Sequence, residues 1–250
     1  MDAKKKASKT CTLSSIGDRQ NIAAGKNLPK KIFSLLRGAA LPLRPKSRSF
    51  RAVNRMKKPL GAIWLFPLFI LLSSYAYATS KIHTFLLYPN SVFVETGTLY
   101  GDGVQNALLT GFKEIHSIEL SPKYYFFTKE RFDNQSNIHI HLGDSGKILY
   151  EVIREIAAPI TFWLDAQFCG HDTARGAKMT PILEELEQIK RHPIKTHTIL
   201  IDDVRLFGTW YFDHVAKEEI LQKLYEINPN YTITYADGFV ENDILVAQAR

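Results

Sequence analysis

Acidic side chains follow a series of short apolar runs in this chain of 250 residues. A single acid in such a place is typically a helix N-cap, because its oxygen accepts a free backbone N–H. A carboxylate at every run in a series is harder to explain by capping alone, and it indicates an edge that binds a ligand. The acids concerned are Glu95, Glu119, Asp144, Asp165, Asp202 and Asp203.

The first run leads into a turn rich in glycine, within "SVFVETGTLYGDGVQNALLTGF" (91–112). The spacing of Gly97 and Gly101 does not match the G-x-G-x-x-G pattern of dinucleotide sites. A wider loop with an acid before it suits an amino acid and a ribose, with no pyrophosphate. Glu95 would then orient or receive the ammonium group of the amino acid, and Glu119 would accept hydrogen bonds from both hydroxyls of the ribose. The alternative is a tight strand-to-helix turn.

Asp165, Asp202 and Asp203 form a second group of interest. If the runs before them are neighbouring parallel strands, about 4.8 Å apart, their carboxylates converge. Three oxygen ligands without Cys or His suit Mg²⁺. The alternative is that Asp202 or Asp203 caps the following helix or pairs with Arg205.

From about residue 81 the apolar runs alternate with helical patterns. Strands are expected over 91–96, 114–120, 137–144, 159–166 and 197–204, and helices over 102–112, 122–133, 146–157, 180–190 and 215–227. The segments "YTITY" and "DILVAQ" close the chain as a hairpin. The pattern predicts an α/β fold in one domain, 81–250, with a doubly wound, mostly parallel sheet closed by an antiparallel C-terminal hairpin.

The sequence also predicts where particular side chains lie on these elements. Val104, Leu108 and Leu109 are expected on one apolar side of the first helix, and Pro181 in the first turn of the fourth. His139 and His141 alternate on the third strand and so share a face, where packing is the expected role. No segment before the first strand is expected to contribute to a site.

Three segments in order resemble the first three motifs of class I S-adenosylmethionine-dependent methyltransferases: "VETGTLYGDG", "SIEL" and "GDSG". The resemblance covers residues 91–250, and it implies a Rossmann-like methyltransferase sheet. It also implies that the donor is held by Glu95, Gly97, Gly101 and Glu119, with Asp144 near the adenine amino group. Gly101→Val would then crowd the donor with little loss of fold.

A narrower resemblance is to small uncharacterised bacterial members with a "WLDGHYSG…T…G…TPILEEL"-type segment, which here reads "FWLDAQFCGHDTARGAKMTPILEEL". The chain departs from it at Ala166, Gln167, Cys169 and His171.

The acid group also resembles the metal site of catechol-type O-methyltransferases, where the ion binds the acceptor's hydroxyls and helps to deprotonate one. That family's basic lysine, three positions after the first acid, is replaced by Phe168. His171 is the remaining proton acceptor, so Asp165 and His171 are the predicted catalytic residues.

The positive charge of the chain belongs to its leader. Residues 1–58 hold sixteen Lys and Arg against two acids, whereas residues 59–250 hold sixteen against twenty-three. The net charge of +7 therefore does not indicate nucleic-acid binding by the globular part. A small-molecule acceptor is the expected partner.

The leader itself, 1–55, is interpreted as a disordered tail, an organelle transit peptide, or untranslated sequence before a start at Met56. From Met56 a basic pair, an apolar stretch and "AYA" have the three parts of a secretory signal peptide over 56–78. The alternative is a membrane anchor over 60–79. In either case the domain would be exported or face outward; it would be cytosolic if the segment is not used as a signal.

Three classes of function remain open. The motifs favour methyl transfer from S-adenosylmethionine to an oxygen of a small acceptor, with or without Mg²⁺. The export signal favours a non-catalytic binding module of the same fold, or an envelope protein that binds another nucleoside, because S-adenosylmethionine is made and kept in the cytosol.

The leader gives the first testable prediction. If Met56 starts the natural protein, mass spectrometry of the native product should detect no peptide from residues 1–55 and a mature N-terminus at Thr79. Abundant peptides from the leader would contradict this.

Overall fold

The computed structural model describes residues 81–170 and 173–249. The leader (1–55), the signal or anchor segment (56–79) and His171 lie outside the described residues, so the interpretations made of them stay predictions. Among the helices of the described ranges, none is both long enough and apolar enough to cross a bilayer.

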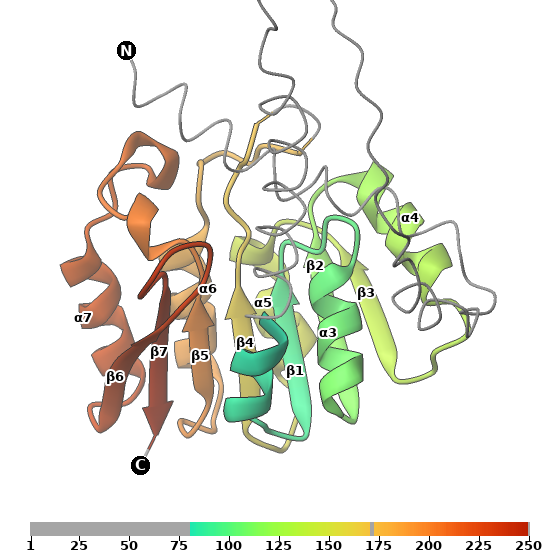
Figure 1. Ribbon diagram of the computed structural model, residues 1–250, viewed down its shortest axis with the longest axis horizontal. Coiled ribbons are helices and arrows are strands. Elements are labelled where there is room, and N and C mark those ends of the chain that lie inside the picture. Colours follow the sequence, from blue (N-terminus) through green and yellow to red (C-terminus); the bar gives the residue numbers. More distant parts are fainter. Residues whose placement is uncertain (1–80, 171–172, 250) are drawn as a thin grey trace, which may run out of the picture. The chain divides into compact units, whose positions relative to one another are not determined.

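The described residues form a seven-stranded sheet in the order β3-β2-β1-β4-β5-β7-β6 (Figure 1). Neighbours from β3 to β5 are parallel, and β7 is antiparallel to both β5 and β6. The predicted doubly wound sheet with a closing hairpin is therefore confirmed. The strands are β1 (Val92–Thr96), β2 (Glu114–Glu119), β3 (Ile138–Leu142), β4 (Ile160–Leu164), β5 (Thr198–Ile201), β6 (Tyr231–Ala236) and β7 (Ile244–Ala249).

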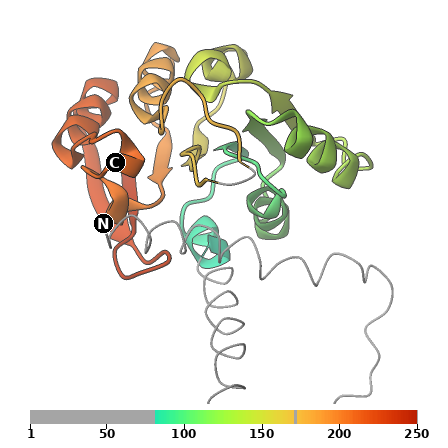
Figure 2. The same cartoon turned by 90° about the horizontal axis from the view of Figure 1, so that it is seen from above.

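Helices cover both faces of this sheet. Figure 2 shows α5, α6 and α7 along one face, and α3 with the helical residues 81–87 on the other. The α-helices are α3 (Asp102–Thr110), α4 (Pro122–Arg131), α5 (Ser145–Ile153), α6 (Ile182–Arg191) and α7 (Lys217–Ile227), with 3₁₀ turns η3 (Val204–Leu206) and η4 (Trp210–Phe212).

Each face has its own core, because β1 and β4 are buried on both sides and alternate residues point to opposite faces. On the α5–α7 face, Phe162 packs in one apolar cluster with Leu149 and Leu186. On the other face, Phe93 and Trp163 pack with Phe85. The Phe85 ring centroid lies 4.8 Å from that of Phe93 and 5.2 Å from that of Trp163.

Some expected details are wrong. Val104 is buried and Leu108 partly buried as expected, but Leu109 is 66% exposed, because the buried side of the short helix includes Ala107 instead. The helix ends at Thr110, since Gly111 adopts a left-handed φ of 91°. Pro181 is the N-cap of α6 rather than a residue of its first turn.

The expectation that no segment before the first strand contributes to a site is also wrong. Residues 81–87 are helical, and Phe85 anchors them in the core. This places Lys81 at the carboxyl edge of the sheet, as described below.

Candidate functional site

Gly97 lets the ends of β1 and β4 approach each other. Its φ is 87°, and its N–H donates to the Ile118 carbonyl at 2.9 Å. A Cβ at this position would lie 2.4 Å from the Asp165 carbonyl oxygen. Any side chain here would force the two strand ends apart, so the glycine joins the predicted donor loop to the predicted acid group.

Gly101 lies at the start of α3, and its expected role in holding a donor stays a prediction. It is the N-cap of α3 with a φ of 82°, and a Cβ would lie 2.7 Å from the Phe132 ring. Valine at this position would combine an unfavourable φ with a clash in the core. The expectation that Gly101→Val leaves the fold intact is therefore wrong.

Glu95 lies beneath the glycine loop and is 3% exposed. Its Oε1 would lie 1.7 Å from a Cβ on Gly103, and its Oε2 accepts a hydrogen bond from Ser117 Oγ at 2.6 Å. Burial raises the pKa of Glu95 to about 8. The carboxyl thus supports the loop from below, and its role toward a ligand ammonium stays a prediction.

Glu119 connects the loop to the end of β2. Its Oε2 accepts the Leu99 N–H at 2.8 Å, and its Oε1 accepts the Ser121 N–H at 2.7 Å. Burial raises its pKa, while these backbone hydrogen bonds act in the opposite direction. Each carboxylate oxygen has a further lone pair, so the predicted hydrogen bonds to ribose hydroxyls are chemically possible.

Asp144 caps α5. Its Oδ1 accepts the Gly146 N–H at 3.1 Å, and its Oδ2 pairs with Lys147 Nζ at 3.0 Å. Capping therefore accounts for this acid, and its contact with an adenine stays a prediction.

The structure brings Asp165, Asp202 and Asp203 together through polar side chains. Lys81 Nζ lies 3.2 Å from Asp165 Oδ2 and 3.5 Å from Asp202 Oδ2. Gln167 Nε2 donates to Asp165 Oδ1 at 3.1 Å and also to Asp203 Oδ2. The predicted convergence of the strand ends is thus confirmed, and Lys81 and Gln167 are additional members.

Asp243, just before β7, is a further carboxylate that the sequence reasoning missed. Arg205 Nη1 lies 2.6 Å from Asp203 Oδ1 and also pairs with Asp243 Oδ2, so the alternative of an Asp203–Arg205 pair is confirmed. No local sequence pattern indicated this acid, because its place depends on the pairing of β5 with β7. Asp243 reaches the cluster because β7 pairs with β5, and its carbonyl accepts the Val204 N–H at 2.8 Å.

Burial dominates the electrostatics of these acids. It raises the pKa of Asp165, which Lys81 opposes and Asp202 reinforces. It also raises the pKa of Asp203 well above its usual range, and both Asp202 and Asp165 add to the effect. Such a cluster is stable only with compensating cations or protons.

The cluster does not fit a magnesium ion as it is arranged. Oxygen ligands suit Mg²⁺, and oxygens of Asp202, Asp203 and Asp243 lie within 4.8 Å of one another. However, Lys81 already bridges Asp165 and Asp202, and Arg205 bridges Asp203 and Asp243. Mg²⁺ would have to displace at least one of these cationic side chains.

No family model matches the sequence, and no curated protein matches it. Solved structures do match the fold. An O-methyltransferase from Bacillus cereus, crystallised in complex with SAH, aligns with a TM-score of 0.51 and 13% identity over 77% of this chain and 93% of that one. Streptomyces venezuelae DesVI aligns with a TM-score of 0.50 and 10% identity over 74% and 97%. The chain has the Rossmann-like fold of class I methyltransferases.

The buried Glu95 predicts a measurable pH dependence. Its pKa is about 8 in the folded chain and normally 4.5. Between these values the folded chain holds a proton that the unfolded chain lacks, so the free energy of unfolding falls as pH rises. Glu95→Gln keeps the shape and removes this term. The free energy of unfolding of Glu95→Gln, relative to that of wild type, should therefore rise by roughly 1–3 kcal/mol between pH 6 and pH 8. The slope is at most about 1.4 kcal/mol per pH unit.

Urea unfolding followed by tryptophan fluorescence would measure this difference, with the exposed Glu130→Gln as the control. Parallel pH profiles for Glu95→Gln and wild type would show that Glu95 is ionised in the folded chain.

Lys81 gives a second prediction for this site. If it is the resident cation, Lys81→Met should lower the free energy of unfolding by roughly 1–3 kcal/mol, because two largely buried carboxylates lose a partner. Millimolar Mg²⁺ should then raise the melting temperature of the variant while leaving wild type nearly unchanged. The opposite pattern, a Mg²⁺ shift in wild type that Asp165→Asn removes, would restore the metal prediction.

Proposed function

We propose that this protein transfers a methyl group from S-adenosylmethionine to an oxygen of a small acceptor. The observation that carries the proposal is the hydrogen bond from Leu99 N–H to Glu119 Oε2, at 2.8 Å. It connects the glycine loop after β1 to the acid that ends β2, at the edge where open α/β sheets bind ligands. The fold shared with the Bacillus cereus enzyme supports the same conclusion.

In this proposal the donor lies over the loop of residues 97–101. Glu119 accepts hydrogen bonds from the ribose hydroxyls, and Asp144 lies toward the adenine amino group. Glu95 contributes indirectly, since its carboxyl fills the space beneath Gly103 and holds the loop in position.

The acceptor would bind beside the acid cluster, because Gly97 already contacts the Asp165 backbone. Its hydroxyl proton would pass to Asp165 or His171, and the oxygen would attack the methyl carbon as the bond from that carbon to sulfur breaks, leaving S-adenosylhomocysteine. Burial raises the pKa of Asp165, which favours proton uptake. The Lys81 ammonium, 3.2 Å from Asp165, would stabilise negative charge that develops on the acceptor oxygen.

A second candidate function is donor binding without chemistry. It is favoured by the hydrogen bonds that Lys81 and Gln167 donate to Asp165. These bonds occupy the carboxylate oxygens that would have to accept a proton in catalysis. An envelope protein that binds another nucleoside is the third candidate. It depends on the segment 56–79, outside the described residues.

The donor site can be tested by calorimetry. Wild type should bind S-adenosylmethionine, and Glu119→Ala should bind roughly 5- to 150-fold more weakly, the equivalent of about 1–3 kcal/mol from two lost hydrogen bonds. Glu130→Ala, on the exposed side of α4, is the matched control and should bind as wild type does. Circular dichroism would verify that Glu119→Ala folds.

The outcomes separate the three candidates. Equal affinity in Glu119→Ala and wild type would refute the placement of the site, and the absence of binding in wild type would favour the third candidate. If binding is found, a methyl-transfer screen with hydroxylated small molecules separates the enzyme from the binding module.

A further inference from the structure

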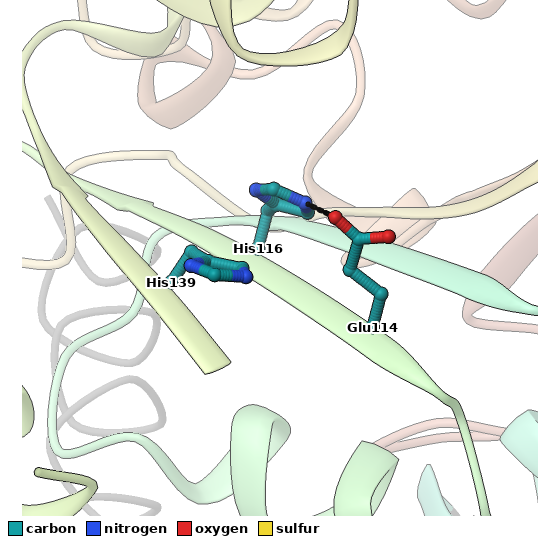
Figure 3. Close-up of side chains that lie close together, drawn as sticks. All are labelled: Glu114, His116 and His139. Atoms are coloured by element: carbon teal, nitrogen blue, oxygen red, sulfur yellow. Dashed lines mark hydrogen bonds and ion pairs between the residues drawn. The ribbon is translucent and has the colours of Figure 1, made fainter. Parts of the chain in front are cut away.

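A histidine-rich cluster lies on β2 and the edge strand β3, apart from the donor edge. His116 of β2 pairs in register with His139 of β3, and Ile118 pairs with His141. Alternation along the strands places Glu114, His116, His139 and His141 on one face of the sheet. Figure 3 shows Glu114, His116 and His139 side by side.

The polar atoms of this cluster converge on His116. Its Nε2 lies 2.9 Å from Glu114 Oε1, and its Nδ1 lies 3.1 Å from His141 Nε2. Its ring stacks on that of His139, with the centroids 4.8 Å apart. Possible ligand atoms of Glu114, His116 and His139 all lie within 4.8 Å of one another.

Packing, the role expected from the sequence, explains this arrangement poorly. An apolar or β-branched side chain would pack at these strand positions without burying a polar group. His116 is instead buried, while His139 is exposed at the sheet edge. The imidazoles of His116 and His139 thus bring ring nitrogens close to the Glu114 carboxylate.

We propose that Glu114, His116 and His139 bind a divalent d-block cation, Zn²⁺ by preference. Two imidazoles and a carboxylate are a common zinc ligand set, with a fourth position open to water. The same set excludes Mg²⁺ as the favoured ion, since Mg²⁺ prefers oxygen ligands alone. The three ligand atoms, which lie within 4.8 Å of one another, would have to move together to reach metal–ligand distances of about 2.0–2.2 Å.

His141 has a separate part in this site. Metal binding at His116 Nε2 leaves the proton on Nδ1, and that N–H needs an acceptor. His141 Nε2, at 3.1 Å, is placed to accept it. Such a partner fixes the tautomer and orientation of a metal-bound imidazole.

The site would act on stability rather than on methyl transfer. His116 lies three residues before Glu119 along β2, or about 10 Å at roughly 3.3 Å per residue. A bound ion would clamp β3, which has a neighbour on one side only, to β2. This inference does not depend on the proposed function.

Zinc binding can be measured on the full, tag-free chain after treatment with EDTA. Calorimetry should find a Zn²⁺ site that His139→Ala weakens by at least about tenfold. Zn²⁺ should also raise the melting temperature of wild type, because it binds the folded state. His214→Ala, which removes an exposed histidine elsewhere, is the matched control and should behave as wild type does.

Cobalt provides a second readout. Co²⁺ in the wild-type site should give the intense visible absorption of a four-coordinate ion, and His139→Ala should lose it. His116 is buried, so its substitution would test folding as well as binding. Glu114→Gln, with a side chain 46% exposed, is the better second ligand variant.

Equal Zn²⁺ affinity in wild type, His139→Ala and Glu114→Gln would overturn the proposal. So would a wild-type protein that shows neither the Zn²⁺ shift in melting temperature nor the Co²⁺ absorption.

Discussion

Burial of carboxylates at the carboxyl edge of the sheet is the constraint on which the rest of this site depends. Glu95, Glu119, Asp202 and Asp203 are each buried. A buried charge is costly unless a proton, a hydrogen bond or an opposite charge compensates it. The local structure supplies all three: burial favours a proton on Glu95, backbone N–H groups donate to Glu119, and cationic side chains reach the aspartates.

The way each acid is compensated separates two halves of the edge. At the ends of β1 and β2, Glu119 accepts the N–H of Leu99 in the glycine loop and that of Ser121, the N-cap of α4. A ligand could therefore replace solvent there without breaking an ion pair. At the other half of the edge, Lys81 forms an ion pair with Asp165, and Arg205 forms one with Asp243. A metal ion would compete with these side chains, whereas an acceptor oxygen could use Lys81 as it stands.

The histidine cluster uses the opposite chemistry at another part of the sheet. Imidazoles and one carboxylate gather around His116 on β2 and β3, whereas the acid cluster offers oxygen ligands alone. The two groups should therefore discriminate between cations. Zn²⁺ is expected at the histidines, and Mg²⁺ would affect the acids only when Lys81 is removed.

The sequence by itself determined the fold class, because buried strands alternate with amphipathic helices and end in a hairpin. It also determined that Glu95, Glu119, Asp165, Asp202 and Asp203 share an edge, since parallel strands end on the same side. Tertiary structure alone decided the charge balance. Lys81 reaches Asp165 because Phe85 packs a helix against β1 and β4, and no local pattern reports a contact across 84 residues.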